Sequence, residues 1–332
     1  MDPLTHTATG LFLSRVGLKQ WTPLATPIVI LAANAPDIDV VTLSWGPLSY
    51  LHYHRHLTHS LVAMPAMALL TVLLVRLVAR RPIRWWGAFG AAFIAVASHL
   101  LLDLTNAYGI RLFLPFSAEW LRLDWNSLTD LWIWGVFLLA LAGPFVGRLV
   151  SSEIASGPQR QRHHGRGFAW FALAFLVLYD CGRGVLHARA VATLDSRIYR
   201  DESPVRVAAL PHPANPLEWR GLVETGDFYA VENVNMAGDF DPTRADVFFK
   251  AVPDPALDAA RATATFQEFL RFSQFPLWRL SPLPEPEGAR QVEVVDLRFG
   301  TPAAPGFAVS AVVGSREQVM DTSFRFGALR PR

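Results

Sequence analysis

Two long apolar stretches, residues 61–79 and 85–105, limit most strongly what this chain can fold into. Each is close to the length of about 20 residues that a helix needs to cross a bilayer. Three arginines and a proline lie between them, at residues 80–84, where a helix would end. The composition agrees, since 52% of the residues are hydrophobic and only 17% are charged, which is low for a soluble protein. We therefore expect an integral membrane protein.

Further apolar segments at residues 22–39, 128–147 and 167–187 bring the expected number of spans to about five. The segment 5–18 has helical character but is too short to cross a bilayer, so we expect a packed or re-entrant helix with His6 near its beginning. The predicted fold of residues 1–192 is therefore a mainly α membrane helical bundle.

The pattern changes after about residue 195. Alternation of apolar and polar residues at 291–297 and 306–313 is typical of strands, whereas residues 255–272 have helical character. Several prolines between these segments mark loops. We therefore predict a second, C-terminal α+β extramembrane domain that is rich in strands and covers residues 195–332.

The segment from His52 to Ser60 contains four histidines and Arg55 within nine residues. Imidazole is the commonest protein ligand of transition metals, and a turn could bring His54 and His59 to one ion. The alternative is a solvated polar loop or a cap on the following helix. With a single cysteine in the chain, a metal would have to be held by His, Asp or Glu.

Two other pairs of residues strengthen the metal hypothesis. Asp37 and Asp39 follow a proline at the end of a predicted span, where they could also serve as helix-end caps. His99 and Asp103 are four residues apart, so they share one helix face and could bind an ion or form a buried hydrogen bond. A histidine such as His6, taken alone, is more often a packing residue than a ligand.

The arginines indicate which side of the membrane these residues face. Arginine clusters at 80–84 and in the basic linker that holds Arg160, Arg162 and His163 are expected in the cytoplasm. The ends of the spans that carry the candidate ligands then meet on the outer side, and the C-terminal domain follows on that side. The sequence thus predicts a multi-pass membrane protein with a metal site on the outer side.

Histidine and carboxylate ligands suit a divalent metal, with zinc favoured for hydrolysis and manganese as the alternative, and the ligands could hold one or two ions. In an enzyme, Asp39 or Asp103 would orient a metal-activated water, while Arg55 would bind a substrate anion or lie at the lipid headgroups. A non-enzymatic metal transporter or sensor is the alternative. Few polar residues continue through the predicted bundle, which favours a surface site over a transport pathway. The net charge of +2 gives no support for a nucleic-acid partner.

These motifs resemble the YdjM/YfhP-like (DUF457) family of bacterial inner-membrane metal-dependent hydrolases. The motifs are Thr5-His6, Pro36-Asp37-Ile38-Asp39, His54-Arg55-x-x-Thr58-His59-Ser60, His99-x-x-x-Asp103 and Asn106-Ala107-Tyr108-Gly109. His56 departs from the pattern, because a glycine is expected there. The resemblance implies a ligand set of His6, Asp37, Asp39, His54, His59, His99 and Asp103. It also implies likeness to zinc-dependent phospholipase C, so we expect a phosphoesterase whose partners are the bilayer and a lipid or lipid-linked substrate.

Overall fold

The computed structural model describes residues 1–154 and 164–327. Three residues of the predicted basic linker, Arg160, Arg162 and His163, lie outside the described residues. The contacts divide the chain into two compact units. The first consists of residues 1–39, 55–187 and 211–216, and the second of residues 40–54, 188–210 and 217–332.

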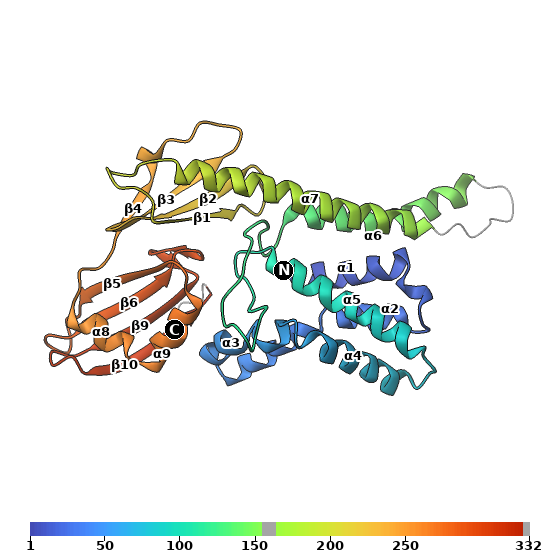
Figure 1. The fold of residues 1–332 in the computed structure, drawn as a ribbon, viewed down its shortest axis with the longest axis horizontal. Coiled ribbons are helices and arrows are strands. Elements are labelled where there is room, and N and C mark those ends of the chain that lie inside the picture. Colours follow the sequence, from blue (N-terminus) through green and yellow to red (C-terminus); the bar gives the residue numbers. More distant parts are fainter. Residues whose placement is uncertain (155–163, 328–332) are drawn as a thin grey trace. The chain divides into compact units, whose positions relative to one another are not determined.

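Helices dominate the first half of the chain (Figure 1). They are α1 (Pro3–Val16), α2 (Ala25–Ala32), α3 (Pro47–Tyr53), α4 (Met64–Ala79), α5 (Trp85–Leu104), α6 (Leu131–Ile154) and α7 (His164–Asp195), with 3-10 helices η1 (Leu18–Gln20), η2 (Ala35–Trp45) and η3 (Leu57–His59). The predicted short helix at 5–18 is present as α1. It begins at Asp2, whose carboxylate accepts hydrogen bonds from the backbone N–H groups of Leu4 and Thr5.

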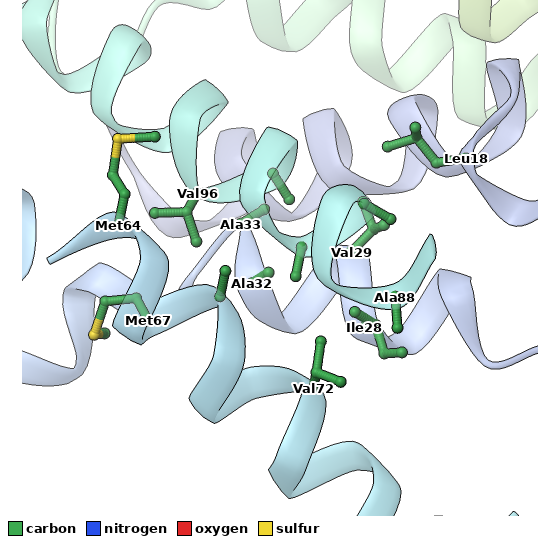
Figure 2. Close-up of a cluster of buried hydrophobic side chains, with 14 of the residues drawn as sticks. Leu18, Ile28, Val29, Ala32, Ala33, Met64, Met67, Val72, Ala88 and Val96 are labelled. Carbon is green, nitrogen blue, oxygen red and sulfur yellow. The ribbon is translucent and has the colours of Figure 1, made fainter. Parts of the chain in front are cut away.

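Helix α5 packs against α1, α2 and α4 in the first unit. Four alanines on α5, Ala88, Ala91, Ala92 and Ala95, are fully buried. Small residues let helix backbones approach closely, as in membrane bundles. Figure 2 shows the resulting core, which includes Ile28 and Val29 of α2, Val72 of α4 and Val96 of α5.

Helices α1 and α2 also approach each other closely, at Gly10. A Cβ on Gly10 would lie 3.0 Å from the Cβ of Ala33 and 3.1 Å from the carbonyl oxygen of Val29. A larger residue there would push α1 away from α2. The glycine therefore allows α1 to bring His6, one turn before it, against the other helices of the unit.

Two helices among the described residues, Trp85–Leu104 and Gly165–Asp195, are long and apolar enough to cross a membrane. Two bent pairs, α2 with η2 and the segment Pro47–His59 with α4, also pass if each pair counts as one span. The apolar part of α6, Leu131–Gly147, is shorter. The structure thus supports membrane helices, but it gives two to four candidate spans, fewer than the five predicted.

The second unit is rich in strands, as predicted. Its elements are β1 (Arg206–Pro211), β2 (Glu218–Glu224), β3 (Phe228–Asn235), η4 (Pro242–Arg244), β4 (Asp246–Phe249), α8 (Pro255–Arg261), α9 (Ala264–Phe272), β5 (Pro276–Pro282), β6 (Arg290–Asp296), β7 (Gly300–Thr301), β8 (Ala304–Pro305), β9 (Phe307–Val313) and β10 (Val319–Phe326). They form antiparallel sheets in the orders β1-β2-β3-β4 and β10-β9-β6-β5, with a small β7-β8 pair.

Helices α8 and α9 pack on the second of these sheets (Figure 1). The strands β6 and β9 coincide with the two alternating stretches of the sequence, and in their register Val292 lies opposite Ala311. Helix α3 also belongs to this unit, because it packs against α9 and β10. His52 of α3 contacts Glu268 of α9 at 2.8 Å, and Tyr50 packs on Phe326.

Candidate metal centre

Four predicted ligands from three separate segments meet in the first unit. Asp37 lies in the first turn of η2, His59 ends η3, and His99 and Asp103 lie one turn apart on α5. One nitrogen or oxygen atom from each residue lies within 4.8 Å of the corresponding atoms of the other three. The side chains of His59, His99 and Asp103 are fully buried, whereas that of Asp37 is 22% exposed.

The distances between these atoms are short. The Nε2 atoms of His59 and His99 are 3.2 Å apart. Asp103 Oδ2 lies 3.4 Å from each of these two nitrogens. Asp37 Oδ1 lies 3.4 Å from His59 Nε2 and 3.7 Å from His99 Nε2. Four ligand atoms around a tetrahedral zinc ion, each about 2.0–2.1 Å from it, are about 3.3–3.4 Å from one another. The observed spacing is close to this value.

The other ring nitrogen of each histidine fixes its tautomer. His99 Nδ1 lies 2.7 Å from the carbonyl oxygen of Ala33. Since a carbonyl only accepts hydrogen bonds, Nδ1 must carry the proton. In neutral His99, Nε2 then carries a lone pair and no proton. His59 Nδ1 lies 3.1 Å from Thr58 Oγ1, and that hydroxyl donates to Asp39 Oδ2 at 3.0 Å. The hydroxyl can then only accept from His59 Nδ1–H, which leaves the Nε2 lone pair facing His99.

Two imidazole nitrogens and two carboxylate oxygens therefore face one another, and one of the oxygens, Asp103 Oδ2, has no hydrogen-bond partner among the described residues. Such an arrangement is electrostatically unfavourable for the protein alone, and buried acceptors that lack a donor are costly. A divalent cation between them would satisfy all four atoms at once. The residues at this site thus fit a metal ion, and a buried cluster of Asp37, His59, His99 and Asp103 could bind one.

His6 lies directly beside this cluster. Its ring stacks on that of His99 with the centroids 3.8 Å apart, and its Nε2 lies 3.3 Å from Asp103 Oδ1. The side chain is fully buried, and neither ring nitrogen has a hydrogen-bond partner. Burial disfavours the charged form of an imidazole and therefore favours the neutral ring. A neutral imidazole with orphaned nitrogens fits a further ligand.

Asp39 lies on the far side of the His59 ring. Its Oδ2 accepts hydrogen bonds from the backbone N–H of Arg55 at 2.9 Å and from Thr58 Oγ1, and it is 3.3 Å from His59 Nδ1. In these contacts Asp39 orients His59 through the nitrogen that points away from the cluster. Carboxylates that contact a ligating histidine in this way commonly hold the ring in its binding orientation.

Arg55 is buried beside the cluster, where its guanidinium donates to Asp103 Oδ1 at 3.0 Å. The Met1 amino group contacts the same carboxylate.

Two residues at the site have roles that the sequence did not suggest. Thr58 connects Asp39 to His59, whereas Ser60 accepts from Ala63 N–H before α4. Asn106 accepts from Arg55 at 3.0 Å; the place of both residues within motifs of the family resemblance was the available signal.

His54, the remaining predicted ligand, belongs to the second unit. It caps the C-terminal end of α3, and its ring stacks on Tyr50 of the same helix at 4.4 Å between centroids. Its role as a ligand therefore stays a prediction, as do the ligand roles of His6 and Asp39.

The part of the sequence that carries this site is similar to known proteins. A family model described as "YdjM inner membrane protein" matches residues 1–190, which include every candidate ligand. Among curated proteins, the chain is similar to "Uncharacterized protein YfhP" of Bacillus subtilis (strain 168). The two are 26% identical over 316 residues, which cover 90% of this chain and 87% of that protein. No solved structure matches the chain.

Proposed function

The chain belongs to the YdjM inner membrane protein family, and on that premise we propose that it is a membrane-bound metal-dependent hydrolase. The proposed substrate is a phosphoester of a lipid or a lipid-linked compound. The observation that carries the proposal is the buried set of two imidazole nitrogens and two carboxylate oxygens that lie within 4.8 Å of one another. Zinc is the metal that this ligand set and spacing favour, with manganese as the alternative.

Each residue would contribute in a defined way. His59 and His99 offer neutral nitrogens whose orientation is set by Thr58 and by the carbonyl of Ala33. Asp37 and Asp103 offer negative charge that balances a divalent ion. Such an ion, when bound, lowers the pKa of water and polarises a phosphoryl oxygen. Asp37 is the most exposed of the four side chains, so substrate and water would reach the site from its side.

The position of the site suits a lipid headgroup. His99 and Asp103 lie in the last turns of α5, one of the two helices long and apolar enough to cross a membrane alone. Ligands at the end of a span would lie near the level of the headgroups, where a phosphodiester is within reach. We further propose that about five spans cross the bacterial inner membrane. In this arrangement the site and the C-terminal domain, residues 195–332, lie on the outer side.

The proposed ligand set also includes His6, Asp39 and His54. His6 contacts Asp103 directly, and its orphaned nitrogens support a place beside the four central ligands. Asp39 and His54 stay in the ligand set that we propose, and the contacts of Asp39 also support an orienting role for His59. Asp39 or Asp103 would then orient the attacking water.

Metal analysis of the detergent-purified full-length protein tests this proposal. We expect about one zinc or manganese ion per chain in the wild type and in a His52→Ala control, and loss of the metal in a His59→Ala/Asp103→Ala variant. His52 is a suitable control because it lies in the second unit against Glu268. The metal-loaded wild type should release phosphorylated headgroups from phospholipid vesicles, and the double variant should not.

Two results would contradict the proposal. A wild-type protein that stays empty after metal is supplied would remove its chemical basis. A loaded protein that hydrolyses no lipid phosphodiester, but carries the metal into vesicles in which it is reconstituted, would instead identify a transporter that uses the same ligands.

A further inference from the structure

Arg55 lies at a strained point of the chain next to the candidate metal centre. Its φ of 54° is in the left-handed region, which a residue with a side chain seldom adopts. Two backbone hydrogen bonds hold it there, one from Arg55 N–H to Asp39 Oδ2 at 2.9 Å and one from Arg111 N–H to the Arg55 carbonyl at 3.3 Å. Strained residues that are held by several contacts are frequent at functional sites.

This backbone conformation directs the side chain into the protein, where only 2% of Arg55 is exposed. One terminal nitrogen, Nη2, donates to Asp103 Oδ1 at 3.0 Å. The other, Nη1, donates to Asn106 Oδ1 at 3.0 Å and to the Gly109 carbonyl at 3.3 Å. The guanidinium carbon lies 4.9 Å from the ring centroid of Tyr108. Arg55 thus joins the last turn of α5 to the turn that follows it.

The contact with Arg55 distinguishes the two oxygens of Asp103. Oδ1 accepts from Arg55 and also contacts the Met1 amino group, whereas Oδ2 is buried, has no hydrogen-bond partner among the described residues and lies 3.4 Å from both His59 Nε2 and His99 Nε2. Rotation of the carboxylate about its Cβ–Cγ bond would break the hydrogen bond to Arg55. The orientation that keeps this bond is the one that points Oδ2 at the cluster.

We infer that Arg55 is a positioning residue, which fixes the Asp103 carboxylate so that Oδ2 alone binds the metal, and that it does not bind the substrate anion. The inference rests on the proposed metal site and adds a role for a side chain outside the ligand set. Arginine suits this role because its planar fork can bond Asp103 and Asn106 at the same time, while lysine has one point of charge.

Metal affinity in the full-length, detergent-purified protein tests the role of Arg55. We would titrate zinc against a competing chelator and record the visible spectrum of the cobalt(II)-loaded protein. Loss of a partner that orients a ligand typically weakens metal binding about 10–100-fold. We therefore expect Arg55→Lys to raise the dissociation constant for zinc by about 10–100-fold and to change the cobalt spectrum. Arg183→Lys is the matched control, because Arg183 is equally buried in the first unit and donates to the Trp125 and Pro216 carbonyls; it should leave both measurements unchanged.

The outcomes separate this inference from the proposed function. If the wild type binds no metal, both fail. If the wild type binds zinc and Arg55→Lys binds it equally well with the same cobalt spectrum, the positioning role is wrong. Weaker binding of inorganic phosphate to metal-loaded Arg55→Lys, with unchanged zinc affinity, would assign Arg55 to the substrate anion instead. If Arg55→Lys fails to fold, Asn106→Ala tests the positioning role instead. This variant removes one acceptor of the Arg55 guanidinium and should therefore also weaken zinc binding.

Discussion

Two of the regions in which the chain buries charged groups have opposite chemistry. In the second unit, Asp296 and Arg298 form an ion pair whose side chains are both fully buried. Arg298 donates to Asp296 through Nε and Nη2 at 2.7–3.2 Å and to the Phe272 carbonyl at 2.9 Å. Its guanidinium also lies 4.9 Å and 4.7 Å from the ring centroids of Phe272 and Phe299. Each of these contacts joins a donor to an acceptor or to an aromatic face.

The candidate metal centre lacks that balance. Its four central atoms are all acceptors, and one of them, Asp103 Oδ2, has no hydrogen-bond partner. Burial of charge alone therefore does not distinguish a functional site from a structural ion pair in this molecule. The difference lies in whether the buried groups satisfy one another, because an unsatisfied set of acceptors is stable only with a ligand.

Loss of one partner should reduce stability more at the buried pair of Asp296 and Arg298 than at the metal centre. Asp296→Ala leaves the guanidinium of Arg298 buried without its carboxylate, a change that typically costs about 3–5 kcal/mol. We expect much faster hydrogen exchange in β5 and β6, measured by mass spectrometry on the full-length protein. Asp258→Ala is the control, since Asp258 is 78% exposed and forms a pair with Arg261 at the surface, so it should change stability by less than about 0.5 kcal/mol. Unchanged protection in Asp296→Ala would show that the pair is not a structural element.

Loss of a carboxylate charge at the metal centre should have the opposite effect on stability and should stabilise the metal-free protein. Asp37→Asn removes one negative charge from the centre and introduces an amide N–H that can donate to Nε2 of His59 or His99. We expect the metal-free variant to be more stable by about 1 kcal/mol, the net value of one hydrogen bond. Hydrogen exchange at the end of α5 in the presence of a chelator measures this change. Asp296→Asn is the comparison and should be destabilising; a destabilised metal-free Asp37→Asn would contradict the all-acceptor description.

Much of this arrangement could be predicted from local sequence patterns. The spacing of His99 and Asp103 places both on one face of a helix, and the structure shows them one turn apart on α5. The alternation at 291–297 and 306–313 predicted the strands β6 and β9, because side chains alternate between the two faces of a sheet. The motifs also identified the family correctly.

Features that depend on tertiary contacts could not be predicted. The helices α2 and α4 are bent away from their neighbours, so apolar length overestimated the number of continuous spans. The segment 40–54 lies between two metal-site motifs in the sequence, yet its helix α3 packs with α9 through His52 and Glu268. The direction of the Arg55 side chain depends on acceptors 48–54 residues away, which no local pattern reveals.

The smallest effect on stability is expected at a partly exposed ion pair of the second unit, which Glu224 forms with two basic residues. Glu224 contacts Lys250 Nζ at 2.9 Å and Arg206 Nη2 at 2.7 Å. Burial alone would raise the pKa of Glu224, but the hydrogen bond from Lys250 and the charge of Arg206 outweigh it, so the pKa is lowered.

Because the pKa of Glu224 is lower in the folded state than in the unfolded chain, its stabilisation is fully present above the unfolded pKa. That stabilisation is lost as the pH falls through the folded pKa. Solvent screening limits the effect to less than about 1 kcal/mol. Between pH 6 and pH 3, exchange in β2 and β3 should therefore accelerate more in the wild type than in Glu224→Gln, with Glu317→Gln on an exposed turn behaving as the wild type does. Equal acceleration in wild type and Glu224→Gln would mean that this satisfied pair, unlike Asp296 and Arg298, adds nothing to stability. The contribution of each ion pair in the second unit to the free energy of unfolding would then depend on its exposure to solvent and not on the pairing of donors with acceptors.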